Sequence, residues 1–243
     1  MPKSVLTLTE SDVEDIFGIT FGDSYGSFSH APFLLEEKNM SFQWLHETEK
    51  EWHFMLQQLD EKKFASSGPH RQSDWEQGWG ENLKQFRRTH TLEDLVPKFY
   101  KFSVMQWDGK LLIPLSDRFR YDLWDVLTKH LFSIELSAYQ TIIELGMGTG
   151  YNLLKIAQKY PEKKVYGSDW AESSLELVKE INATFHTQIQ PFQMNLFEPA
   201  LRQRSLLDIR TIPYPSSVPF KDAVVLSCGT MAQQGQKFHP IID

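Results

Sequence analysis

Thr141-Ile-Ile-Glu-Leu-Gly-Met-Gly-Thr-Gly150 is the stretch of this 243-residue sequence that decides its fold. An apolar run that ends in Glu144 is followed by glycine at positions 146, 148 and 150, and the next residues, 151–158, have the spacing of a helix. This order is typical of a buried strand that turns sharply into a helix. Three of the five loop residues between them are glycine, so a ligand can reach the backbone there.

Two kinds of ligand use such a loop: a dinucleotide and S-adenosylmethionine. The dinucleotide fingerprint G-x-G-x-x-G needs its last glycine at position 151, which is Tyr151 in this sequence. Glu144, two residues before the first glycine, suits a ligand that carries a cationic amine and a sulfonium. The residues therefore favour S-adenosylmethionine.

Further strands and a helix follow at regular intervals. Residues 164–169 form a short strand pattern ending in Asp169, 19 residues after Gly150. In a βαβ unit this acid lies beside the glycine loop, where its two oxygens can accept hydrogen bonds from both hydroxyls of a ribose. Residues 171–185 predict an amphipathic helix, 189–194 a third strand followed by Asn195, and 222–227 a fourth, buried strand.

The stretch 141–150 resembles motif I of the class I S-adenosylmethionine-dependent methyltransferases. The resemblance implies an α/β fold with a Rossmann-like sheet, S-adenosylmethionine as cofactor, and methyl transfer to an acceptor. It also implies roles for six residues. The glycine loop with Glu144 would hold the methionyl part, Asp169 the ribose, and Asn195 would hydrogen-bond the adenine amino group; the loop glycines are Gly146, Gly148 and Gly150.

Other interpretations of the same residues stay open. Glycine at a strand-to-helix turn can be purely structural, and Asp169 can cap the helix that follows it. Asn195 can be an ordinary loop residue. Two other functions compete with methyl transfer: a non-catalytic S-adenosylmethionine-binding or scaffold protein, and a nicotinamide-dependent oxidoreductase.

The N-terminal region, residues 1–135, is expected to be helical with a β-hairpin and to act as a lid or substrate region over a cofactor domain at 136–243. Ser11 and Glu14 have capping-box spacing. Residues 42–64 predict a long helix, 102–115 a hairpin around Asp108-Gly109, and 121–132 another helix. Pro114 places its strand at an edge or marks that strand's end.

Several side chains in this region have two interpretations. The aromatic-rich stretch 74–100 predicts either a core of large side chains or the wall of a binding cleft. Arg118 and Arg120 suit either an acidic substrate group or pairing with acids of the protein. His46 and His53 are seven residues apart, and no carboxylate or thiol cluster at metal-ligand spacing accompanies them, so we expect no metal site.

Composition limits the partners. The net charge is −7, and residues 1–60 hold three Lys or Arg against eleven Asp or Glu, which weighs against nucleic acid. No apolar stretch is long enough to cross a membrane. The single cysteine, Cys228, excludes an intramolecular disulfide and favours a small apolar role over a nucleophile. We therefore expect a cytoplasmic protein.

The resemblance covers about residues 137–243 and accounts for only strands one to four of the seven that the family's sheet has. The sequence thus predicts a sheet that is incomplete at its C-terminus, with an open edge through which the chain can self-associate. The acceptor is expected to be a small molecule, a sugar or a natural-product intermediate. Tyr151 and His239 are candidates for a catalytic base, and nothing in the sequence selects one, so the catalytic residue stays unknown.

Overall fold

The computed structural model describes residues 4–21, 35–46, 68–97, 104–197 and 223–228, together with residues 50, 52, 53 and 57. The chain divides into two compact units. Unit 1 comprises Met1–Ser66 and Lys98–Glu135, and unit 2 comprises Ser67–Pro97 and Leu136–Asp243. The division differs from the predicted domains 1–135 and 136–243, because residues 67–97 group with the C-terminal part.

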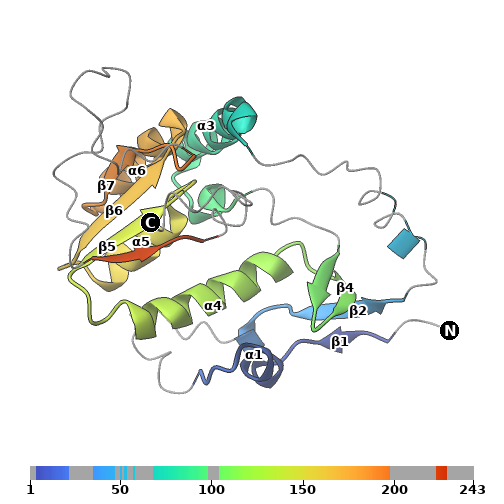
Figure 1. Cartoon of the computed structure of the whole chain (residues 1–243). Helices are drawn as coiled ribbons and strands as arrows, with labels where there is room; N and C mark the ends of the chain where they lie inside the picture. Colours follow the sequence, from blue (N-terminus) through green and yellow to red (C-terminus); the bar gives the residue numbers. More distant parts are fainter. Residues whose placement is uncertain are drawn as a thin grey trace. The chain divides into compact units, whose positions relative to one another are not determined.

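Unit 1 contains a four-stranded antiparallel sheet with the order β1-β2-β4-β3 (Figure 1). Its elements are β1 (Leu6–Thr7), α1 (Glu10–Phe17), η2 (Leu35–Glu37), β2 (Ser41–Leu45), β3 (Met105–Trp107), β4 (Lys110–Pro114) and α4 (Phe119–Glu135). The predicted hairpin is confirmed as β3 and β4. Its turn residues Asp108 and Gly109 have φ of 46° and 71°, as a tight two-residue turn requires. Pro114 is the last residue of β4, which lies inside the sheet, so this proline marks the end of its strand.

Helix α1 begins with a capping box, but not the predicted one. Thr9 is the N-cap: the Asp12 N–H donates to its Oγ1 at 3.2 Å, and the Thr9 N–H donates to Oδ2 of Asp12 at 2.8 Å. The prediction of Ser11 and Glu14 was wrong, because both residues lie inside the helix. The Glu14 carboxylate instead accepts a hydrogen bond from the Phe21 N–H at 2.7 Å, after the helix has ended.

The long helix predicted over residues 42–64 was wrong at its start, because Ser41–Leu45 form strand β2. This strand pairs with β1 on one side and β4 on the other, which gives its backbone groups partners that a helix would otherwise supply. Phe42 and Leu45 are buried, and Phe42 joins a core cluster with the hairpin and α4. Of the remaining segment, the described residues 50, 52, 53 and 57 are helical.

Unit 2 is an α/β structure built on a parallel sheet with the order β7-β6-β5-β8. Helix α5 connects β5 to β6, and α6 connects β6 to β7 (Figure 1). Its elements are η3 (Pro69–Arg71), α3 (Gln72–Thr89), η4 (Leu92–Leu95), β5 (Thr141–Leu145), α5 (Tyr151–Lys159), β6 (Lys164–Asp169), α6 (Glu172–Phe185), β7 (Gln190–Gln193) and β8 (Val224–Leu226). All five residues of β5 are buried, as expected for a strand with a neighbour on each side.

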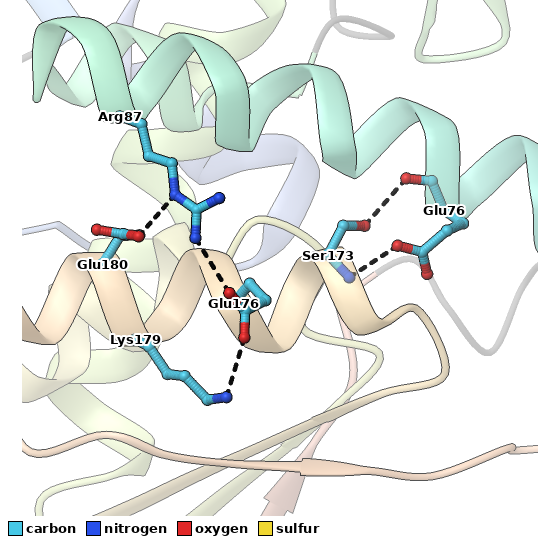
Figure 2. A network of polar contacts seen from close by, with 6 residues as sticks. All are labelled: Glu76, Arg87, Ser173, Glu176, Lys179 and Glu180. Atoms are coloured by element: carbon cyan, nitrogen blue, oxygen red, sulfur yellow. Dashed lines mark hydrogen bonds and ion pairs between the residues drawn. The ribbon is translucent and has the colours of Figure 1, made fainter.

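The strands and helices predicted from 141 onward are confirmed as β5, α5, β6, α6, β7 and β8, with shifts of one or two residues at their ends. Helix α3 is packed alongside α6, and a set of polar contacts joins the two helices (Figure 2). This packing explains why residues 67–97 belong to unit 2. Within the described part of the chain, no helix combines the length and hydropathy that a membrane crossing needs.

Candidate functional site

The parallel pairing of β5 and β6 brings the predicted residues to one edge of the sheet. Leu145 is in register with Ser168, so the glycine loop and Asp169 leave the sheet side by side. The N–H groups of Gly146 and Met147 both donate to the carbonyl of Ser168 at 2.8 Å. The carboxyl ends of parallel strands are where α/β sheets bind ligands. This edge is therefore the candidate site.

All three glycines of the loop have left-handed backbone conformations. Their φ values are 73° for Gly146, 54° for Gly148 and 77° for Gly150. Two of them also have close protein neighbours. A Cβ at Gly148 would lie 3.0 Å from Cζ2 of Trp79, and one at Gly150 would lie 2.7 Å from Cγ2 of Val178. Packing and backbone geometry thus require glycine at both positions, whatever the loop binds.

The loop leaves few N–H groups to bind a phosphate. In addition to the bonds from Gly146 and Met147, Gly148 donates to Oδ2 of Asp169 at 2.9 Å and Gly150 donates to the Met147 carbonyl at 2.9 Å. A pyrophosphate site uses such N–H groups and a helix N-terminus as donors. Here four of them already donate to protein oxygens. The geometry agrees with the absence of glycine at position 151 in disfavouring a dinucleotide.

Asp169 connects the loop to the start of α6. Oδ2 accepts the Gly148 N–H, and Oδ1 accepts the Ala171 N–H at 3.0 Å. The residue is 6% exposed, and burial raises the pKa of its carboxyl group to about 6; the backbone hydrogen bonds limit the rise. The N-cap of α6 is Ala171, so Asp169 is not the cap itself. The backbone of Trp170 also stabilises the charged form by hydrogen bonding, and since an ionised carboxylate has about four acceptor positions, at least one stays available for a hydroxyl donor.

Glu144 is a completely buried acid next to this edge. Oε1 accepts a 3.0 Å hydrogen bond from Nδ2 of Asn152, whereas Oε2 has no hydrogen-bond partner among the described residues. Burial raises the pKa of Glu144 to about 7, and the charge of Asp169 adds to the rise; side-chain hydrogen bonds from Asn152 and the Cys228 thiol and the charge of Lys155 counteract it. A buried acceptor without a donor is costly, so the presence of Glu144 at this position needs a reason. A cationic or N–H ligand group is one.

Cys228 follows β8 and lies near Glu144. Burial raises the pKa of its thiol to about 12, and the Glu144 carboxylate adds to this rise. A thiol with so high a pKa is almost entirely protonated at neutral pH, and the thiol is a poor nucleophile in that form. The structure therefore fits the predicted small apolar role better than a catalytic one.

Asn195 lies two residues beyond the end of β7. Its Oδ1 accepts a hydrogen bond from the Phe197 N–H at 3.0 Å, which is the local turn contact that the loop interpretation expects. The ring of Phe197 lies 5.5 Å from that of Trp170, the residue after Asp169. Asn195 thus lies at the same edge of the sheet as Asp169. The hydrogen bond described for its side chain uses Oδ1 and leaves the amide N–H groups available to other acceptors.

Some residues of the site were not predicted. Asn152 holds Glu144, Trp79 covers Gly148, and Thr149 donates from its Oγ1 to the Leu95 carbonyl at 2.6 Å. The aromatic density at 74–100 was a signal for Trp79, which is 8% exposed. Nothing in the local sequence marks Asn152, because its role depends on the position of Glu144 one loop earlier.

The sequence suggests Tyr151 as a catalytic base and Arg118 for substrate binding, and the structure describes contacts of both. Tyr151 begins α5, and Nζ of Lys155 lies 4.8 Å from the centre of its ring. His239 lies outside the described residues. Arg118 pairs with Asp122 at 3.6 Å in unit 1, in agreement with the pairing interpretation. No cluster of three potential metal ligands exists among the described residues.

Comparison with known proteins adds little. No family model and no curated protein matches this chain. Among solved structures, a similar chain is coclaurine N-methyltransferase bound to N-methylheliamine and S-adenosylhomocysteine, with a TM-score of 0.33 and 15% identity. The match covers 59% of this chain and 45% of that one, so the chain spans less than half the length of that protein. A similarity this low supports no functional statement.

Proposed function

We propose that this chain binds S-adenosylmethionine at the carboxyl ends of β5, β6 and β7 and transfers its methyl group to an acceptor. In this proposal the parallel sheet of unit 2 is a Rossmann-like methyltransferase sheet. The observation that carries the proposal is that two buried acids, Glu144 and Asp169, lie at one glycine loop, most of whose N–H groups already donate to protein oxygens. Such a site suits a ligand that carries positive charge and hydroxyl groups but no phosphate.

Each residue of the site would bind a different part of the ligand. The free Oε2 of Glu144 would accept from the cationic amine of the methionyl part, directly or through a water molecule. Asp169 would accept from the ribose hydroxyls with the acceptor positions that Gly148 and Ala171 leave open. Asn195 would hydrogen-bond the adenine amino group. Gly146, Gly148 and Gly150 would shape the backbone against which the ligand lies.

The electrostatics of Glu144 support this fit. Without a ligand, burial raises the pKa of this carboxyl group to about 7, so the neutral and ionised forms coexist near neutral pH. A cation placed against it favours the ionised form, because opposite charges a few ångströms apart lower the pKa of an acid. Ligand binding would therefore remove a proton from Glu144 and supply the missing partner of Oε2.

S-adenosylmethionine, when bound, supplies an electrophilic methyl group, and its transfer to a nucleophile leaves S-adenosylhomocysteine. The chain's own contribution to such a reaction is to hold the reactants in line and to exclude water. A base is needed only where the acceptor must lose a proton. We propose a small molecule, a sugar or a natural-product intermediate as the acceptor, since the acidic composition of the chain disfavours nucleic acid.

Calorimetric titration of the full chain tests the proposal. S-adenosylmethionine, S-adenosylhomocysteine and NAD would be titrated separately at pH 8, where Glu144 can ionise. We expect heat of binding with both adenosyl ligands and none with NAD. Binding of NAD alone would contradict the proposal and favour an oxidoreductase. Binding of the adenosyl ligands without release of S-adenosylhomocysteine in the presence of an acceptor panel would favour the non-catalytic alternative.

A further inference from the structure

Helix α6 begins beside the candidate site without a capping side chain of its own. Its N-cap residue is Ala171, whose methyl group cannot accept a hydrogen bond. The N–H groups in the first turn of a helix have no partners within that helix and need acceptors elsewhere. Asp169 accepts the N–H of Ala171 itself. The N–H groups of Glu172 and Ser173 are satisfied from a different part of the chain.

Glu76, on helix α3, supplies these acceptors. Its Oε2 accepts the Glu172 N–H at 2.7 Å, and its Oε1 accepts the Ser173 N–H at 2.8 Å. The Ser173 hydroxyl donates in the opposite direction, to the main-chain carbonyl of Glu76, at 3.0 Å (Figure 2). A carboxylate also suits the partial positive charge of a helix N-terminus. One residue of α3 therefore makes three hydrogen bonds to the first turn of α6.

A second group of polar contacts joins the same two helices farther along. Arg87 pairs with Glu176 at 3.0 Å and with Glu180 at 2.6 Å (Figure 2). The Arg87 side chain is 48% exposed, so solvent weakens these ion pairs. They hold α3 against α6 but do not touch the start of α6. Arg87 therefore provides a matched comparison for Glu76 on the same interface.

We propose that Glu76 is a positioning residue for the candidate site, which it serves by fixing the turn between Asp169 and the start of α6. The inference rests on the function proposed above. Its path is short: Glu76 holds the N–H groups of residues 172 and 173, Ala171 donates to Asp169, and Asp169 holds Gly148. A shift of the start of α6 would displace the Ala171 N–H, which donates to Oδ1 of Asp169. The orientation of the Asp169 carboxylate would then change as well.

Two further observations connect α3 to the same hydrogen bond. Trp79, three residues after Glu76, packs against Gly148 so closely that a Cβ there would lie 3.0 Å from its ring. The Glu76 carboxylate also acts electrostatically on Asp169: burial is the main cause of the raised pKa of Asp169, and Glu76 adds to it. Helix α3 thus packs against Gly148 through Trp79 and acts electrostatically on Asp169 through Glu76.

The test is the affinity of the full chain for S-adenosylhomocysteine, measured by calorimetry on the wild type and on Glu76→Ala, Glu76→Gln and Arg87→Ala. Loss of both acceptors in Glu76→Ala should weaken binding by about tenfold or more, on the scale of a lost charge-assisted hydrogen bond. Glu76→Gln keeps one oxygen and should lose less. Arg87→Ala should bind like the wild type.

A double variant separates positioning from simple helix stabilisation. In Glu76→Ala combined with Ala171→Ser, the new hydroxyl can cap α6 locally, because serine is a favoured N-cap residue. We expect this variant to regain thermal stability but not affinity, since the connection to α3 is still missing. Ala171→Ser alone is the control for any effect of the hydroxyl on the site.

Each outcome has one meaning. Recovery of affinity together with stability in the double variant would show that Glu76 is only a cap and overturn the inference. Normal affinity in Glu76→Ala would overturn it as well, and if that variant does not fold, normal affinity in Glu76→Gln serves the same purpose. If the wild type binds no S-adenosylhomocysteine, the proposed function itself fails.

Discussion

The backbone N–H of Gly148 donates a 2.9 Å hydrogen bond to Oδ2 of Asp169, which joins the glycine loop after β5 to the end of the neighbouring strand β6. The other oxygen of Asp169 accepts the N–H of Ala171. One buried carboxyl group therefore fixes two backbone segments on the edge where the proposed ligand would lie. In the proposed site, ligand binding would depend on the same side chain as the backbone structure, so the two effects need separate measurements.

Replacement of Asp169 by alanine should reduce both stability and binding. Two buried N–H groups lose their acceptor, and we expect the free energy of unfolding to fall by about 2–4 kcal/mol. Urea denaturation at pH 4.5 is the appropriate measurement, because Asp169 is then mostly protonated in the folded state, below its raised pKa of about 6. The cost of a buried charge is then small. Glu162→Ala, at an exposed acid, is the control, and equal stability of both variants would contradict the expectation.

Glu144→Gln should change how stability depends on pH. The folded-state pKa of Glu144 is raised to about 7 from its ordinary value of 4.5, so its contribution to stability is complete below about pH 4.5 and is lost as pH rises through 7. The loss amounts to about 3 kcal/mol. Glutamine does not ionise, so the variant should gain about this much relative to the wild type between pH 4.5 and pH 8.

Urea denaturation of the wild type and Glu144→Gln over this pH range checks the sign as well as the size. The unliganded variant should be more stable than the wild type at pH 8 and yet fail to bind the cationic ligand. Glu162→Gln, at an exposed position, should follow the wild type at every pH. Parallel stability curves for Glu144→Gln and the wild type would mean that folding does not raise the pKa of Glu144.

A structural element could be predicted from the sequence when the residues that determine it lie close together along the chain. The order strand, glycine loop, helix at 141–159 is encoded by neighbouring residues, and it was predicted with the correct elements. Strand β2 was not, because Phe42, Trp44 and Leu45 also fit helical spacings. The partner strand β4 begins 65 residues after the end of β2, and only the pairing of these two strands favours a strand over a helix here.

The site shows the same limit. Glu144 and Asp169 could be selected because each ends a strand pattern near the glycine loop. Glu76 could not, since an acid on the surface of a helix has no local feature that distinguishes it from its neighbours. Its role follows from the packing of α3 on α6, which brings it to residues 96 and 97 positions away. The Thr9 cap was missed for a different reason: the overlapping segments 9–12 and 11–14 both fit capping signals, and only the hydrogen bonds of the folded chain distinguish them.

Gly150→Ala should destabilise the chain through two separable effects. The residue has φ of 77°, and a Cβ would lie 2.7 Å from Cγ2 of Val178. Backbone strain and overpacking together should lower the free energy of unfolding by about 2–4 kcal/mol. In Gly150→Ala combined with Val178→Ala the steric part disappears, so the double variant should lose less than the sum of the single variants. Strict additivity in urea denaturation would show that the contact with Val178 does not matter.

Thr149→Val should loosen the connection between the glycine loop and η4. The Thr149 hydroxyl is buried and donates to the Leu95 carbonyl at 2.6 Å, and valine keeps the shape of the side chain while it removes this donor. The Leu95 carbonyl then loses a buried partner, which should cost about 1–3 kcal/mol. Thr149→Ser keeps the hydroxyl and should lose only the contribution of one methyl group.

Hydrogen exchange locates the effect of Thr149→Val within unit 2. The N–H of Val96 donates to the Glu93 carbonyl in η4, so its exchange rate reports on whether that turn stays formed. We expect faster exchange at Val96 in Thr149→Val and near-normal exchange in Thr149→Ser, because only the first variant releases η4 from the loop. Equal exchange in both variants, with equal stability, would show that the hydrogen bond to Leu95 does not hold the two segments together.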